Sequence, residues 1–211
     1  MKSIRTIIAV IAVLIATPSL FAQAGRSDVG VAIVGSSLTD TTIVDAGDKI
    51  KFDFDEKTGL GLSFNRYWTD QFSTEVALQN ISADLKLSEE GSPITFNVGK
   101  LEARSITAMG QWHFMHTGRF QPYVGAGVAH MTGEFKFNND FLEPGDDPKT
   151  DLESKTTWTA SVGANIPLTR SLSLGTEFKY IPWSTVEKGG SSDDSIDVDP
   201  LTFAVALKWR F

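Results

Sequence analysis

The last eleven residues of the chain alternate strictly between two kinds of side chain, and no other feature constrains the fold as strongly. One face carries the apolar side chains of Leu201, Phe203, Val205, Leu207, Trp209 and Phe211. The other face carries Thr202, Ala204, Ala206, Lys208 and Arg210. Because successive side chains of a strand point to opposite faces, this period of two predicts a strand whose faces meet different surroundings.

The same alternation recurs in seven earlier segments, whereas no segment after residue 24 shows a sustained helical period. The seven further strands are expected around residues 29–33, 60–68, 72–78, 105–114, 120–132, 156–168 and 172–180. Together with the last eleven residues, these segments predict an all-β chain of eight strands.

The connections between the expected strands are alternately short and long. The short connections are residues 69–71, 116–119 and 169–170. The long connections are roughly residues 38–57, 84–101, 138–154 and 185–198. In an up-and-down barrel, this order places every short turn at one end and every long loop at the other, as in outer-membrane barrels. We therefore predict an eight-stranded antiparallel transmembrane up-and-down β-barrel, with long loops extracellular and both mature termini periplasmic.

Alternation alone also suits a soluble eight-stranded barrel with its apolar face inside. Three observations favour the membrane barrel. The less apolar face is mainly Gly, Ala, Ser, Thr, Asn and Gln, which suit a narrow lumen better than a soluble exterior. A strand from Leu201 to Phe211, tilted by about 40°, is about 25 Å high, which matches the apolar band of such barrels. Aromatic residues cluster near strand ends as in interfacial belts: Trp68, Phe72, Trp112, Phe114, Phe120, Trp209 and Phe211 beside short turns, and Trp158, Tyr180 and Trp183 toward long loops.

The first 24 residues have the composition of an export signal. After a positively charged start, residues 7–16 form an apolar run too short to span a membrane, and Ala22-Gln23-Ala24 gives a small-x-small cleavage pattern. An uncleaved anchor helix is the alternative. We expect residues 1–24 to be removed and residues 25–211 to form the barrel, whose formal charge is then −9 instead of −7.

Composition also bears on the classes of function. The absence of cysteine excludes disulfides and thiolate metal sites, and a pI near 4.9 argues against nucleic-acid binding. The three histidines form no recognisable triad or metal motif. Ser105 lies eight residues from His113, and nothing in the sequence indicates that the two side chains meet. We expect no enzyme activity, no catalytic residue, no metal and no cofactor.

If the apolar face meets lipid, several charged side chains point into the lumen. They are Glu75, Glu177, Lys179, Lys208 and Arg210. Buried charges persist when they are paired, so we expect a network of acid–base contacts across the interior. This network is either a structural brace that helps to close the barrel or a polar constriction in a permeation path. Eight strands leave room only for side chains or one small ligand, so an open water-filled pore is not expected.

The expected long loops hold most of the acidic residues. They carry a charge of −12, against +3 for the rest of the mature chain, and the densest stretches are 140–153 and 191–199. Outer-membrane lipid and lipopolysaccharide, bridged by divalent cations, are partners that this charge suits, although no ordered calcium-loop spacing is present. A solvated surface that binds nothing is the alternative.

Several blocks of the sequence resemble the OmpW family of small outer-membrane barrels. The most specific are Pro-Tyr-Val-Gly-Ala-Gly at 122–127 and the closing block from Asp199-Pro200 to Lys208-Trp209-Arg210-Phe211. Further similar pieces are Gly59-Leu60-Gly61-Leu62, Tyr67, Thr69-Asp70, Val76-Ala77-Leu78, Gln111-Trp112-His113-Phe114 and Arg119-Phe120-Gln121. The resemblance covers most of the mature chain. It implies an eight-stranded barrel with a narrow hydrophobic passage for small apolar molecules, and alkane importers belong to the family.

The resemblance also implies an apolar gate of large inward side chains on the third and seventh strands, where this chain has Ala77 and Lys179. The candidates for lumen or ligand lining are Ala77, Gln79, Met109, Lys179, Ile181 and Trp183. A terminal aromatic residue such as Phe211 resembles the signal read by the barrel assembly machinery, so Phe211 is expected to matter for insertion.

Two hypotheses on function follow from these residues. The first is a narrow passive conduit for small, mostly hydrophobic molecules. The second is a plugged structural or surface-interaction barrel, whose acidic extracellular loops act without transport. A lumen filled continuously with side chains, with no pocket below the loops, favours the second.

Overall fold

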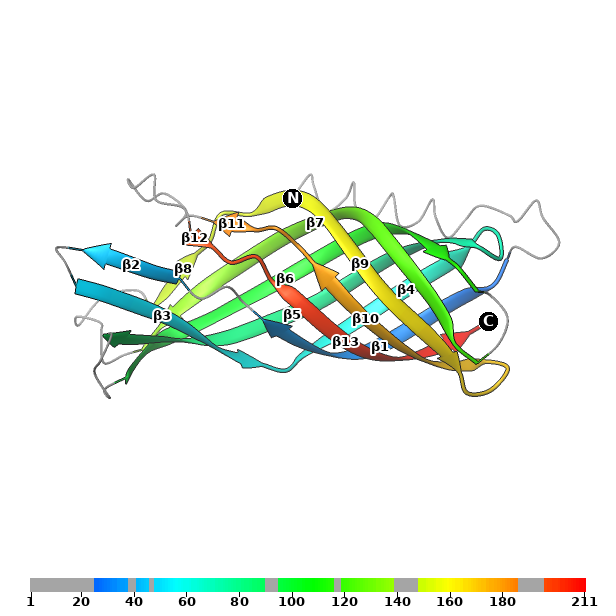
Figure 1. The fold of residues 1–211 in the computed structure, drawn as a ribbon, viewed down its shortest axis with the longest axis horizontal. Coiled ribbons are helices and arrows are strands. Elements are labelled where there is room, and N and C mark those ends of the chain that lie inside the picture. The colour runs from blue at the N-terminus through cyan, green and yellow to red at the C-terminus, as the bar shows by residue number, and fades with distance from the viewer. Residues whose placement is uncertain are drawn as a thin grey trace.

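A computed structural model of the chain describes residues 25–37, 41–45, 48–89, 95–115, 119–138, 148–185 and 196–211. Within this part of the chain, eight strands form one closed antiparallel barrel, seen from the side in Figure 1. They are β1 (Ser27–Ser37), β4 (Gly59–Tyr67), β5 (Phe72–Glu89), β6 (Thr95–His113), β7 (Gln121–Phe137), β9 (Lys155–Pro167), β10 (Leu172–Tyr180) and β13 (Leu201–Arg210). Each strand pairs with the next one in this order, which confirms the predicted up-and-down barrel.

The last strand closes the barrel against the first. Ten residue pairs join β1 to β13, from Asp28 opposite Arg210 to Ser37 opposite Leu201. One residue further on, Phe211 and Ser27 exchange two backbone hydrogen bonds of 2.9 Å. Along β13 the predicted apolar face is exposed and the opposite face is buried, so the closing residues behave as their alternation predicts.

Two of the predicted short connections are turns of the same design. The Thr69 side chain accepts hydrogen bonds from the backbone N–H groups of Gln71 and Phe72. The Thr169 side chain does the same for residues 171 and 172. Threonine therefore stabilises both turns by satisfying backbone donors that the strands leave unpaired. These turns lie at the same end of the barrel as Phe211, which we call the turn end; the opposite end is the loop end (Figure 1).

The loop end contains more strand than expected. The additional strands are β2 (Thr41–Asp45), β3 (Asp48–Lys57), β8 (Lys149–Asp151), β11 (Ser184–Thr185) and β12 (Ile196–Asp197). β3 pairs with β5 and with β2, β8 pairs with β7, and β11 pairs with β12.

The predicted gaps at 38–57 and 84–101 are wrong for most of their length. β5 and β6 stay paired up to Ser88 and Thr95, far beyond the ends that the alternation predicts. Outward residues of this region such as Asp84 and Lys100 are charged, which interrupts the apolar alternation although the backbone pairing continues and Phe96 is again 56% exposed.

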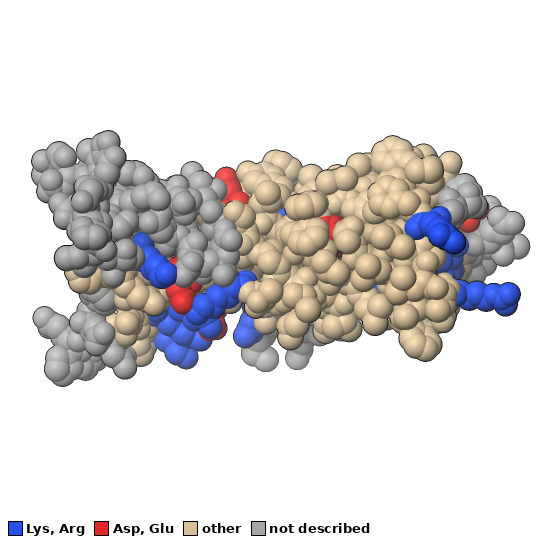
Figure 2. Space-filling view, turned by 60° about the horizontal axis from the view of Figure 1, so that its bottom comes forward, with Lys and Arg blue, Asp and Glu red and all other residues tan. Residues whose placement is uncertain are grey.

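The barrel is apolar outside and polar inside, which is the reverse of a soluble protein. Leu60 and Trp209 are 67% and 60% exposed, whereas Thr107 and Gln111 are completely buried. Figure 2 shows the middle of the barrel as a broad band with few charged side chains. A surface of this kind requires lipid around it, so the soluble barrel considered above is excluded. Among the described residues, no helix is long and apolar enough to cross a membrane.

The aromatic belts hold with one exception. Trp112, Phe120 and Phe211 are exposed near the turn end, and Trp158 is 57% exposed toward the loop end. Trp183 is completely buried and lies inside the lumen, because the chain leaves the sheet after Tyr180, where β10 ends. The expected export signal over residues 1–24 lies outside the described residues.

Candidate functional site in the barrel interior

The interior changes from polar to apolar along the barrel axis. On β10 and the residues that follow it, the buried row runs from Ser173 and Glu177 through Lys179 to Ile181 and Trp183. β5 shows the same order, from Ser73, Glu75 and Gln79 to Ile81 and Ala83. The turn half of the lumen is therefore polar, and the loop half is apolar.

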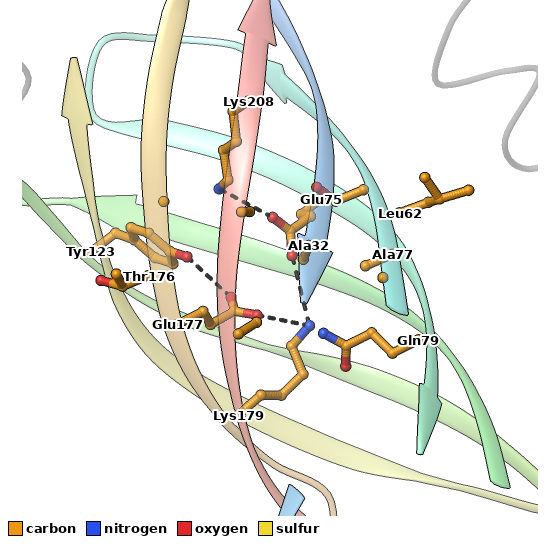
Figure 3. Close-up of a pocket in the computed structure, with 15 residues that line it drawn as sticks. Ala32, Leu62, Glu75, Ala77, Gln79, Tyr123, Thr176, Glu177, Lys179 and Lys208 are labelled. Atoms are coloured by element: carbon orange, nitrogen blue, oxygen red, sulfur yellow. Dashed lines mark hydrogen bonds and ion pairs between the residues drawn. The ribbon is translucent and has the colours of Figure 1, made fainter. Parts of the chain in front are cut away.

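Four charged side chains meet in the middle of the lumen, and we call Glu75, Glu177, Lys179 and Lys208 the charge cluster. The Lys179 Nζ atom lies 2.9 Å from a Glu177 carboxylate oxygen and 3.8 Å from a Glu75 carboxylate oxygen. The Lys208 Nζ atom lies 3.8 Å from the other Glu75 oxygen. Figure 3 shows these contacts converging from β5, β10 and β13. The formal charges cancel, so the cluster satisfies the condition under which buried charges persist.

Neighbouring residues fix the geometry of the charge cluster. The Tyr123 hydroxyl donates a hydrogen bond of 3.2 Å to Glu177, and the Lys208 ammonium lies 5.5 Å from the centre of the Tyr123 ring. Gly175 leaves room for Lys208, because a Cβ atom at this position would lie 2.8 Å from the lysine Cε atom. A larger residue at position 175 would push Lys208 out of place.

Arg210 lies apart from the charge cluster. Its Nε atom donates a hydrogen bond of 3.1 Å to Asp28 on the neighbouring strand, and its guanidinium lies 5.9 Å from the centre of the Tyr67 ring. Near this pair, the Ser73 hydroxyl and the His113 Nε2 atom are 2.8 Å apart. Ser73, and not Ser105, is therefore the serine at His113, and neither this contact nor the one between Asp28 and Arg210 has a sign in the sequence.

The axis of the barrel is nearly filled at the level of the charge cluster. A cavity of about 30 Å³ remains beside it, lined in part by Ala77, Gln79 and Lys179. This volume accommodates about one water molecule and no organic solute. Met109 is also buried on the inward face, where its Cε atom would lie 3.1 Å from a Cβ atom at Gly125.

An apolar cluster occupies the lumen on the loop side of the charge cluster. Its buried members are Ile81, Ala83, Leu101, Ala103, Ala129, Met131, Ile181, Trp183 and Val198, with Phe135 and Leu152 packed against them. Most of these side chains belong to barrel strands, whereas Ile181, Trp183 and Val198 come from segments outside the sheet. The lumen candidates therefore divide into two groups: Ile181 and Trp183 lie in the apolar cluster, and Ala77, Gln79 and Lys179 line the small cavity.

Asp199 holds the segment that carries Trp183. Its carboxylate accepts a hydrogen bond of 2.8 Å from the Trp183 backbone N–H and one of 3.2 Å from the Tyr180 hydroxyl. The residue has a φ of 35°, a left-handed conformation that Asp tolerates better than most residues. The Asp199-Pro200 block does not predict this role from the sequence, in which a polar residue beside an expected strand start is the only signal.

The interior thus combines a closed charge cluster with an apolar cluster beside it. A solute that passes along the axis at this level has to separate buried opposite charges, which costs free energy. The apolar cluster offers an environment in which small apolar groups are favourable. The acidic stretches expected to bind cations lie largely outside the described residues.

A family model and a curated relative both relate this sequence to outer-membrane proteins of the OmpW type. The model of the OmpW family matches residues 19–211. Outer membrane protein W of Escherichia coli (strain K12) is 28% identical over 168 residues, which cover 76% of this chain and 76% of that protein.

Solved structures show the same fold at lower identity. OprG of Pseudomonas aeruginosa, an outer membrane protein, matches with a TM-score of 0.70 and 17% identity over 90% of this chain and 97% of its own. The outer membrane protein AlkL, determined in lipid bilayers, matches with a TM-score of 0.63 and 17% identity over 92% and 94% of the two chains. Both likenesses concern the fold of the barrel.

Proposed function

The chain belongs to the OmpW family of outer-membrane barrels, and from this premise we propose that it is a narrow passive conduit for small, mostly hydrophobic molecules. The observation that carries the proposal is the apolar cluster, an apolar compartment inside a barrel whose lumen is otherwise polar. Apolar side chains inside a membrane barrel gain little over apolar side chains in lipid, so their collection here favours a role in binding solutes.

The proposal includes an orientation. The loop end faces the cell exterior and the turn end, with the mature N-terminus and Phe211, faces the periplasm, as is usual for barrels with short periplasmic turns. Residues 1–24 are removed on export, and the terminal Phe211 is recognised by the assembly machinery. In this orientation, a solute from outside reaches the apolar cluster before the charge cluster.

We assign Trp183 as the side chain that a solute replaces. It is completely buried, belongs to no strand and is held from the loop side by Asp199. A solute that takes its place keeps the apolar cluster, which includes Ile81 and Met131, filled. The exchange is therefore favourable for apolar molecules and unfavourable for polar ones.

The test is uptake of a radiolabelled medium-chain alkane by intact cells that lack the gene and produce single variants. Wild-type protein is expected to increase uptake, and Trp183→Ala is expected to increase it further. Trp158→Ala is the matched control, because Trp158 faces lipid and is 57% exposed. Uptake equal to that of cells without the protein, across alkanes of several lengths, would overturn the proposal.

The second candidate is a plugged barrel that acts through its surface. It is favoured by one observation, the filling of the axis down to a cavity of about 30 Å³. The same uptake experiment separates the two candidates: a plugged barrel predicts that wild type and Trp183→Ala both leave alkane uptake unchanged.

A further inference from the structure

The lipid-facing band has a sharp upper edge on β6. From the turn end, the outward side chains are Trp112, Gly110, Ala108 and Ile106, and the next outward residue is Arg104. Glu102 and Lys100 follow on the same face. Arg104 is therefore the first charged residue above the apolar band on this strand, at the level where lipid headgroups begin.

Polar side chains flank Arg104 on both neighbouring strands. Asn80 on β5 and Thr132 on β7 lie directly opposite it in the strand register. Ser82 follows Asn80 on the outward face of β5 and lies opposite Glu102. Figure 2 shows charged side chains gathered at the loop-side edge of the uncharged band.

A surface groove of about 270 Å³ lies between these strands. Its polar lining is Asn80, Ser82, Lys100, Glu102 and Arg104, with Leu60 at its apolar side. Leu60 is 67% exposed, so the groove opens onto the lipid-facing surface. The groove thus places hydrogen-bond donors and cations beside an apolar wall. The donors and cations suit the phosphate of a lipid headgroup, and the apolar wall suits its first acyl carbons.

The described carboxylates near Arg104 do not form an ion pair with it: on its β7 side it borders Glu134 and Asp151, and Glu134 pairs with Lys136. Glu102 accepts hydrogen bonds of 2.7 Å from both Lys100 and Lys136, and Lys57 pairs with Asp84 nearby. Within the described ranges, Arg104 forms neither an ion pair nor a side-chain hydrogen bond. A guanidinium with five free donors is the group best suited to bind a phosphate in two-point geometry.

We propose that this groove binds the phosphate of an outer-leaflet glycolipid, with Arg104 as the principal phosphate ligand and Asn80, Ser82 and Lys100 as supporting donors. The proposal rests on the orientation given above, which places the groove in the outer leaflet, and it is independent of solute uptake. A lipid is favoured over free phosphate because the groove lies at the edge of the apolar band and is open to it.

The test measures lipid retention by the folded protein. Purified wild-type protein is placed in nanodiscs that contain lipid A with both phosphates, and bound lipid is counted by native mass spectrometry. Wild type is expected to retain lipid A, and Arg104→Gln is expected to bind it at least about tenfold more weakly, because one charge-assisted contact is lost. Arg170→Gln is the matched control, since Arg170 is exposed in a turn at the opposite end.

Two further arms keep the result unambiguous. Asn80→Asp leaves Arg104 in place but sets a carboxylate opposite it, so this variant is also expected to lose lipid A. Lipid A without phosphates is expected to bind to wild-type protein as weakly as phosphorylated lipid A binds to Arg104→Gln. Millimolar inorganic phosphate is expected to displace little lipid A from wild-type protein. Equal retention by the Arg104 and Arg170 variants, or equal retention of the phosphate-free lipid, overturns the proposal. Because the count is made on folded barrels in nanodiscs, its outcome does not depend on alkane uptake.

Discussion

Removal of one cation from the charge cluster is expected to destabilise the barrel strongly. In Lys179→Met, the apolar volume of the side chain is nearly kept, whereas Glu75 and Glu177 retain only Lys208 as a counter-charge. Lys179 is 1% exposed, so water does not replace the lost ammonium group. Leaving a buried charge without its partner costs about 3–5 kcal/mol, and we expect this loss in the free energy of unfolding.

The double variant Glu177→Gln/Lys179→Met tests the reason for this loss. It removes one charge of each sign and leaves Glu75 paired with Lys208, whose Nζ atom lies 3.8 Å away. If the cost comes from charge imbalance, the double variant recovers most of the free energy that Lys179→Met loses. Without that coupling, the two losses add.

The assay is equilibrium unfolding by urea in lipid vesicles, followed by the difference in gel migration between folded and unfolded barrel. Lys57→Met is the control, because Lys57 forms an ion pair of 2.6 Å with Asp84 that is half exposed, and such pairs contribute about 1 kcal/mol or less. The reasoning is refuted if Lys179→Met unfolds within about 1 kcal/mol of wild type, or if the double variant is as unstable as the sum of its single changes.

Three further outcomes are expected. Deletion of Phe211 reduces assembly into the outer membrane, and normal heat-modifiable migration of the truncated protein in cells would contradict this. Asp199→Ala removes the acceptor of the Trp183 N–H, so the barrel loses about 1–3 kcal/mol of stability and the Trp183 amide exchanges its hydrogen faster. An unchanged exchange rate argues against the hydrogen bond from Trp183 to Asp199. Hydrogen bonds from Lys100 and Lys136 hold the pKa of Glu102 at about 2 instead of 4.5. Their contribution to stability is therefore complete above pH 4.5 and is lost as the pH falls toward 2. An NMR titration of the Glu102 carboxyl group checks this value.

The alternation of the sequence predicts the barrel because a membrane strand meets lipid on one face and a polar lumen on the other. The eight strands, their neighbours and the inward orientation of Glu75, Lys179 and Lys208 all follow from that contrast. Strands can no longer be predicted from alternation where the lipid-facing residues cease to be apolar. On β6 the outward residues from Arg104 to Lys100 are charged, so the apolar alternation is interrupted there although the strand continues to Thr95.

The candidate site is predictable in composition but not in arrangement. Parity shows that Lys208 and Arg210 both face inward, yet it does not show that Lys208 meets Glu75 whereas Arg210 meets Asp28. That difference arises from the register of β13 against β1 and β10, which depends on backbone pairing along the whole strand. The role of Asp199 is equally hidden, because it depends on a left-handed backbone conformation outside the strands.

The two halves of the lumen differ in how easily they can open. Glu75, Glu177, Lys179 and Lys208 lie within strands, so the hydrogen-bond ladders that close the barrel hold their backbones in place. Trp183 lies outside the sheet, and the segment around it is tied by a few hydrogen bonds to Val198 and Asp199. Local opening costs least where few backbone hydrogen bonds hold a segment, so we expect Trp183 to move at a free energy below that of global unfolding. Under the proposed function, the apolar half exchanges the Trp183 side chain for a solute while the charge cluster keeps its ion pairs, so the two roles assigned to the interior do not compete.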